Sequence, residues 1–217
     1  MTFLQAINAV LRRLREDEVA ASNTSDYSKM IAEYVNQAIY DTEHAWDWNC
    51  LKETITLTTA ATDSLYDFHT ADVKIIEAIN ETKNWVMRVI PADYQHRLQY
   101  LDSSNSDSPY YYSFLSKNGT SSQVKLYPTP DGVESIRFLC VKHTPLYDID
   151  GTDDSNEIVC PSHPVVLNAY ARAISERGED GGIGFNEADQ IANSALADAI
   201  SLDASLNNPC EIAWYAI

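Results

Sequence analysis

Two pairs of cysteine and histidine have the residue types and spacing of zinc ligands. Cys140 precedes His143 by three positions, and Cys160 precedes His163 by the same interval, so together they would supply two thiolates and two imidazoles. The first pair lies in a run that alternates as a strand does, and residues three apart on a strand face opposite sides. We therefore expect no metal site at these residues, and the sequence predicts no cofactor.

The acid-rich segment 148–157 is a candidate calcium loop, because it offers several oxygen ligands. An EF-hand loop places a glycine sixth and a glutamate twelfth, whereas here Gly151 is fourth and Glu157 is tenth, counted from Asp148. No helical pattern precedes the segment. A solvated loop is the favoured interpretation, with weak Ca²⁺ binding as the alternative.

Motifs for phosphate binding or catalysis are not recognisable. The glycine-rich run 178–184 follows a predicted helix and carries two acids and no lysine, so it would repel a phosphate and predicts a turn. No nucleophile stands in a known catalytic motif. We predict that the protein is not an enzyme, although a small hydrolase that uses two unpatterned carboxylates stays an alternative.

Adjacent tyrosines mark one predicted strand. On a strand, Tyr110, Tyr112 and Phe114 share one face and Tyr111 lies on the other. Core packing explains one face, and aromatic side chains on the second face could stack on a sugar or on a partner protein. Tyr110, Tyr111 and Tyr112 are therefore candidate contact residues.

The C-terminal residues are apolar, which is unusual for a chain end. Pro209 cannot continue a helix, and Ile212, Trp214, Tyr215 and Ile217 follow it in a segment too short to form a core. This pattern suits an extended arm laid into a groove of another protein, with aromatic anchors in pockets. The alternative is that the arm folds back onto its own subunit.

Composition restricts the partners. The 217 residues include 15 Lys and Arg against 32 Asp and Glu, a net charge of −17. This balance argues against reading a nucleic-acid sequence and against docking on an anionic membrane. Residues 1–50, 51–158 and 159–217 carry −4, −7 and −6, so the acidity is expected to be evenly spread. No signal-peptide or membrane-span pattern is visible, which favours synthesis and retention in a cytoplasm.

Hydrophobic spacing predicts an α+β protein. Helical periodicity is seen over 3–14 and 27–46, alternation over several segments from 51 to 143, and helical periodicity again from 164 to about 205. Neither helical pair can bury its apolar stripe alone. We expect a four-helix base built from both chain ends, with an inserted antiparallel β-sandwich-like module of six or seven strands.

These elements define four predicted parts of the chain. The predicted parts are the first half of the base (1–50), the β module (51–158), the second half of the base (159–205) and an extended C-terminal arm (206–217).

Several short motifs occur in the same order in a known family. They are FLQAINAVLRRL in the first helix, Trp46-Asp-Trp48-Asn, Val124-Lys-Leu-Tyr-Pro128-Thr-Pro130, Ile158-Val-Cys-Pro161 and an alanine-rich last helix. With the order of elements, they resemble the adaptor, or head-to-tail connector, proteins of tailed bacteriophages. The similarity is greatest to the tail tubular and tail accessory proteins of short-tailed phages.

The resemblance implies a structural protein of the virion neck, made in the host cytoplasm. Such proteins form a ring, commonly of twelve subunits, beneath the portal protein, extend the DNA channel and dock tail-nozzle or other tail proteins. It implies that the C-terminal arm reaches the portal or a neighbouring subunit through Ile212, Trp214, Tyr215 and Ile217, and that Tyr110–Tyr112 face the tail. DNA would pass without sequence-specific binding, since an acidic lining repels it.

A second function agrees with the same residues. The β module and its tyrosines would also suit a carbohydrate- or receptor-binding module of a phage tail. Ring formation with a portal protein separates the connector from this alternative.

Overall fold

The computed structural model describes residues 1–69, 73–101, 106–118, 121–178 and 184–206. The chain divides into two compact units, which are treated separately here. The helical unit comprises Met1–Cys50 and Thr144–Ile217, and the β unit comprises Leu51–His143. Cys210 and the four apolar residues near the C-terminus lie outside the described residues.

The first two helices begin at side-chain caps. Helix α1 (Phe3–Arg13) starts after Thr2, whose hydroxyl accepts from the backbone N–H of Gln5, while the Gln5 side chain accepts from the N–H of Thr2. Helix α2 (Asp26–Ala45) starts after Ser25, which exchanges the same pair of bonds with Ser28. These capping boxes satisfy backbone donors that a helix start leaves without partners.

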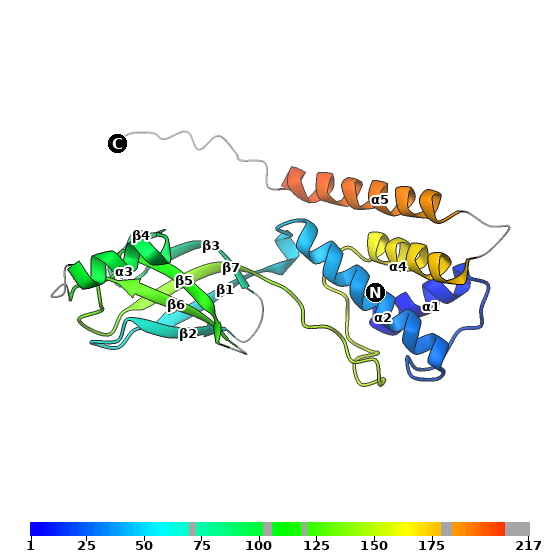
Figure 1. The fold of residues 1–217 in the computed structure, drawn as a ribbon, viewed down its shortest axis with the longest axis horizontal. Helices are drawn as coiled ribbons and strands as arrows, with labels where there is room; N and C mark the ends of the chain where they lie inside the picture. Colours follow the sequence, from blue (N-terminus) through cyan, green and yellow to red (C-terminus); the bar gives the residue numbers. More distant parts are fainter. Residues whose placement is uncertain (70–72, 102–105, 119–120, 179–183, 207–217) are drawn as a thin grey trace. The chain divides into compact units, whose positions relative to one another are not determined.

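The later helices complete the helical unit. They are α4 (Ser162–Arg177) and α5 (Phe185–Leu206), and a short 3₁₀ helix, η1 (Asn49–Leu51), ends the first segment. Helix α4 stops at Gly178, whose φ of +60° is the left-handed conformation that closes many helices. In Figure 1, α4 lies between α5 and the pair formed by α1 and α2, and it packs against all three.

One apolar core joins the two ends of the chain, which confirms the predicted four-helix base. Because apolar residues recur every three or four positions, α1, α2 and α4 each present one stripe to this core, and α5 adds Ala188. The fully buried members include Phe3, Ile7, Val10, Ile31, Val35, Val165, Ala169 and Ala173.

The segment after the β unit belongs to this core. The Tyr147 ring stacks on the Phe3 ring, with 5.0 Å between centroids, and its hydroxyl donates to the Glu157 carbonyl over 2.8 Å. The Asn36 amide donates to the Tyr147 carbonyl and accepts from its N–H. Residues 144–158, which the sequence pattern had grouped with the strands, therefore pack on α1 and α2.

The described residues of the β unit form one seven-stranded sheet in the order β1-β7-β3-β4-β5-β6-β2. The strands are β1 (Lys52–Thr58), β2 (Leu65–His69), β3 (Val73–Asn80), β4 (Trp85–Val89), β5 (Tyr111–Asn118), β6 (Ser121–Tyr127) and β7 (Ser135–Lys142). Strand β1 runs antiparallel to β7, from Lys52 opposite Val141 to Thr58 opposite Ser135. All pairs are antiparallel except β4 with β5, a parallel pair that the expected antiparallel module lacked.

The connection between β4 and β5 explains the parallel pair. A parallel neighbour requires a crossover, and helix α3 (Ala92–Leu101) supplies it. The Ser113 hydroxyl of β5 bonds to the Gln95 side chain of α3, and both residues are buried. Helix α3 therefore covers the face of β5 that carries Ser113.

The opposite face of the sheet encloses the core of the β unit. The rings of Phe68 on β2 and Phe138 on β7 approach to 4.8 Å between centroids, although their strands lie near opposite ends of the sheet order. The sheet must therefore curl so that its two halves face each other, as the predicted sandwich-like module requires. The buried members of this core are Phe68, Ala78, Met87, Tyr112, Val124, Leu126, Ile136, Phe138 and Cys140.

We expect Phe3→Ala to destabilise the helical unit by about 3–5 kcal/mol, because it removes a fully buried ring and leaves a cavity against Tyr147. Urea unfolding followed by the helical circular-dichroism signal measures the loss. Leu146→Ala is the control, because Leu146 is 64% exposed and its truncation should cost less than about 0.5 kcal/mol. Equal losses in the two variants would contradict the assignment of Phe3 to the core.

Candidate interaction surfaces

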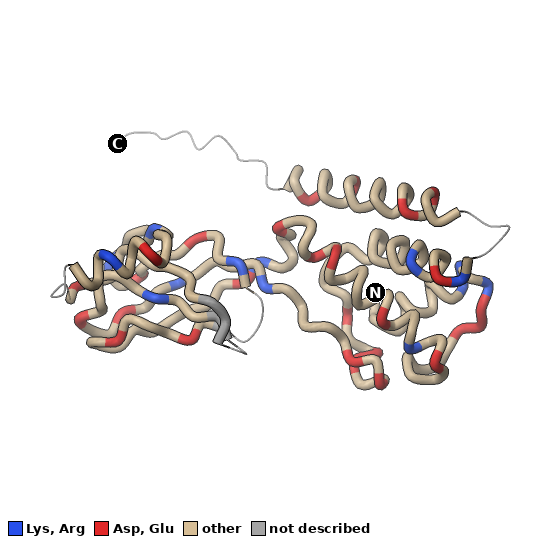
Figure 2. Tube along the Cα trace, viewed as in Figure 1, with Lys and Arg blue, Asp and Glu red and all other residues tan. Residues whose placement is uncertain are grey.

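The two units differ in charge. The helical unit carries 6 Lys and Arg against 21 Asp and Glu, a net charge of −15, whereas the β unit carries 9 against 11, a net charge of −2. The expectation that acidity is evenly spread was therefore wrong. The reason is that the acid-rich segment 148–157 belongs to the helical unit rather than to the β unit. Figure 2 shows acidic positions in this segment and along α5.

Most basic residues of the helical unit are paired with acids of the same unit. Four of them form ion pairs inside the unit, each pair at least partly exposed and so contributing little to stability. The pairs are Arg12–Glu18, Lys29–Asp150, Arg172–Asp41 and Arg177–Glu16. The carboxylates that remain form a surplus of negative charge on the surface of this unit.

The end of α5 is held against the end of α2. The Trp46 indole N–H donates to the Asp203 carboxylate over 3.0 Å, and the backbone N–H of Asn49 donates to the same carboxylate. Trp48 is buried and its indole N–H donates to the Thr42 carbonyl over 2.7 Å. Both tryptophans thus order the stretch that leads to Cys50, where the first segment of the helical unit ends.

A buried carboxylate binds the first residue of the second segment of the helical unit. Glu43 on α2 is 1% exposed and accepts from both the backbone N–H and the hydroxyl of Thr144, each over 2.7 Å. Burial raises the pKa of Glu43, and the two bonds from Thr144 offset part of that rise. Sequence spacing could not reveal this contact, because its two residues are far apart in the chain.

The three candidate tyrosines have different environments. Tyr112 is buried in the core of the β unit, and burial raises its pKa. Tyr111 is half-buried, and Tyr110 is 38% exposed just before β5 begins, with its ring 4.7 Å from that of Tyr111. The structure thus assigns Tyr112 to packing, whereas Tyr110 and Tyr111 keep part of their surface exposed.

With this geometry described, the chain can be compared with known families. The model of the SU10 adaptor protein family matches residues 1–210. The chain belongs to this family. The match confirms the resemblance to phage head-to-tail adaptors and identifies a structural protein of the phage neck. No curated protein is significantly similar to the chain.

Cys140 and Cys160, the two cysteines of the Cys-His pairs, are both buried, whereas Cys50 is exposed. Cys140 is buried in the β unit, where burial raises the pKa of its thiol to about 12, and Cys160 is buried in the helical unit, where burial also raises the thiol pKa. A neutral thiol is a poor metal ligand. The two Cys-His pairs lie in different units, and within the described ranges no three His, Cys, Asp or Glu side chains gather as a metal site.

The acidic segment uses its carboxylates to hold its own backbone. Asp153 accepts from the N–H of Asp148 over 2.7 Å, Asp148 accepts from the N–H of Asp150 over 2.9 Å, and Asp154 accepts from the N–H of Ser22 over 3.0 Å. These bonds explain the acid-rich composition as loop structure. Most of the glycine-rich run, 179–183, lies outside the described residues.

The helical unit of the adaptor also contains open cavities. One of about 390 Å³ lies beside α2 and is lined by Tyr40, Asp41, Leu146 and Arg172, among others. The Arg172 and Asp41 side chains of this cavity form an ion pair with each other. No helix in the part of the chain that the structure describes combines the length and apolar character needed to cross a membrane.

We expect Glu43→Gln to flatten the pH dependence of stability. Because the folded pKa of Glu43 is raised, its contribution is greatest below its ordinary pKa and is lost as pH rises through the folded value. As the pH falls from neutral toward the ordinary glutamate value of 4.5, Glu43 should therefore contribute increasing stability, and Glu43→Gln should remove that contribution. Thermal unfolding across this range measures it. Glu33→Gln, on the exposed side of α2, is the control; equal pH slopes in all three proteins would contradict the prediction.

Proposed function

We propose that this adaptor forms an oligomeric ring beneath the portal protein, extends the DNA channel and provides a docking surface for tail-nozzle or other tail proteins. The family match over residues 1–210 is the observation that carries the proposal. The resemblance of the sequence motifs to connector proteins suggests twelve subunits. The adaptor acts in the virion neck as a non-catalytic assembly protein made in the host cytoplasm.

The charge of the helical unit supports passage of DNA. A protein that grips DNA neutralises phosphates with Lys and Arg, and most of the basic residues in this unit are paired with its own acids. A surplus of carboxylates repels the phosphate backbone, so DNA moves past without sequence-specific binding. The net charge of −15 on this unit supports that behaviour.

Two further contacts belong to the same proposal. Four apolar residues, Ile212, Trp214, Tyr215 and Ile217, anchor their segment to the portal or to a neighbouring subunit, since apolar side chains are costly in water unless they are covered. Tyr110, the most exposed of the tyrosine cluster, contributes to the surface that meets a tail protein, with Tyr111 beside it.

Assembly with the portal tests this function. The purified chain, alone and mixed with the portal protein of its phage, is examined by sedimentation velocity and negative-stain electron microscopy. We expect a ring, either alone or once portal is added. A chain that stays monomeric in both conditions, or that binds glycans and ignores portal, contradicts the proposal.

Deletion of residues 209–217 tests the anchor. We expect a soluble subunit with an unchanged thermal unfolding temperature that binds portal or its neighbours at least about tenfold more weakly, because the apolar anchors are lost. A chain in which the same positions are replaced by glycine and serine keeps the length and should behave like the deletion. If the deletion unfolds the isolated subunit, the segment belongs to its own core and the anchor is wrong.

A further inference from the structure

Helix α5 has a face that its own subunit leaves uncovered. Only Ala188 and Ala192 are buried among its 22 residues, and its packing is against α4. Most helices in proteins depend on burial of an apolar face for their stability. A helix this long, with two buried alanines, therefore presents surface that a partner could cover.

One stripe of that face alternates acidic and aliphatic side chains. Steps of four, three, four and four residues place these positions on one line along the helix, over roughly 22 Å at the rise of an α-helix. Ile191 is 43% exposed and Leu202 is 68% exposed, and α5 contains no Lys or Arg. We call this line the α5 stripe; it consists of Glu187, Ile191, Ser194, Asp198 and Leu202, all exposed.

The β unit carries a surface of the opposite character. On β4, Met87 points into the core, so Val86 and Arg88 lie on the outer face, and Val86 is 58% exposed. Helix α3 covers the same face, because Gln95 bonds to Ser113, which alternates with the core residue Tyr112.

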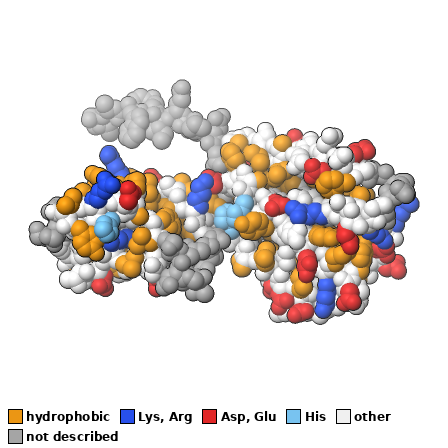
Figure 3. Space-filling model, in the orientation of Figure 1, with side chains coloured by type: hydrophobic (Ala, Val, Ile, Leu, Met, Phe, Trp, Pro, Cys, Tyr) orange, Lys and Arg blue, Asp and Glu red, His pale blue; other side chains and the backbone are white. Residues whose placement is uncertain are grey.

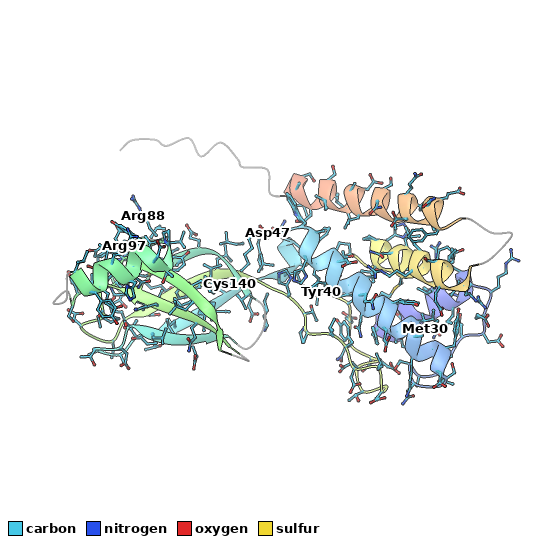
Figure 4. The ribbon with its side chains drawn as sticks, viewed as in Figure 1. Met30, Tyr40, Asp47, Arg88, Arg97 and Cys140 are labelled. Carbon is cyan, nitrogen blue, oxygen red and sulfur yellow. The ribbon has the colours of Figure 1, made fainter. Side chains whose placement is uncertain are left out.

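The exposed side of α3 extends this surface with aromatic rings and a second guanidinium. Tyr94 is 50% exposed and Tyr100 is 69% exposed, with Arg97 between them on the helix. Figure 4 shows Arg88 and Arg97 on the side of the β unit where α3 lies, and Figure 3 shows basic and hydrophobic side chains mixed there. We call this surface the β4/α3 patch; it consists of Val86, Arg88, Tyr94, Arg97 and Tyr100.

Among the described residues, the two guanidinium groups of the patch have no acidic partner. Neither Arg88 nor Arg97 forms an ion pair with a described residue, and Asp93, one turn before Arg97, does not pair with it. By contrast, the guanidinium groups of Arg137, Arg172 and Arg177 each pair with an acid of their own unit. Arginine and tyrosine are the residue types most enriched at the energetic centres of protein interfaces.

We propose that the β4/α3 patch of one copy binds the α5 stripe of the next copy in the ring. The inference rests on the proposed ring and names its contact. Two cations among apolar groups face two acids among apolar groups, so the surfaces complement each other in charge and in hydrophobic character. Because the patch and the stripe are different surfaces, the contact is head-to-tail, and head-to-tail contacts are the kind that close into rings.

DNA is a weaker occupant for the patch. Two guanidinium groups release few counterions, and the chain around them carries a net charge of −17. The α5 stripe of a neighbouring subunit offers the same guanidinium groups carboxylates that lie between aliphatic side chains, which match the apolar and aromatic part of the patch.

Charge reversal with rescue tests the contact in the full chain, under the condition in which the natural chain assembles. Arg88→Glu with Arg97→Glu should weaken assembly by at least about tenfold, and Glu187→Arg with Asp198→Arg should do the same, because each places like charges together. The chain that carries all four substitutions should recover assembly. Sedimentation velocity measures the assembly, and circular dichroism verifies that each variant is folded.

Arg15→Glu with Lys29→Glu is the control matched to the arginine reversal. It makes the net charge more negative by the same amount, but on the helical unit and outside both surfaces, and this variant should assemble normally. Assembly that withstands both reversals, or that the fourfold variant does not recover, overturns the contact while the ring stands. No assembly of the natural chain, alone or with portal, overturns the ring and the contact together. If the charge-reversal variants change only the shape of a monomer, the two surfaces make contact within one chain. If the arginine reversal instead abolishes DNA binding, the patch is a nucleic-acid surface. Either result overturns the proposal.

Discussion

The helical unit depends on burial of the apolar stripe of α1, and residues that follow the β unit in the sequence cover this stripe. Phe3 packs on Tyr147, and α4 covers α1 and α2 from the other side. Because neither end of the chain can bury its own stripe, the two ends must associate before either is stable. This requirement explains why a complete β unit can be inserted between α2 and α4: its entry and exit are held on the helical unit by Trp48 and by Glu43, which binds Thr144.

The same constraint redistributes charge. Residues 144–158 are drawn onto α1 and α2 by the bonds of Tyr147 and Asn36, and their five acids go with them. The helical unit becomes strongly acidic while the β unit is close to neutral. Among the described residues, the β unit keeps two guanidinium groups, those of Arg88 and Arg97, outside any ion pair. The total of −17 therefore conceals a large difference in net charge between the two units.

Surfaces left uncovered in one subunit are the natural candidates for contacts between subunits. Helix α5 buries two alanines and exposes acids and aliphatic residues, while β4 and α3 expose arginine, tyrosine and valine. Exposed apolar groups that are each flanked by charge can pair specifically with a complementary surface. They also avoid a large continuous apolar surface, which would cause the free subunit to aggregate. The C-terminal anchor would add a second contact to the same assembly.

The sequence by itself determined the kinds of element and their order. Apolar spacing on the helices and alternation on the strands are local properties, and they predicted the α+β class, the shared helical base and the inserted strands. It also carried the family motifs. Only the tertiary structure decided which unit receives residues 144–158, why β4 and β5 run parallel, that Tyr112 is a core residue, and that Arg88 and Arg97 share one surface. Each of these depends on contacts between residues on different elements of the chain, and such contacts leave no periodic signal in a single sequence.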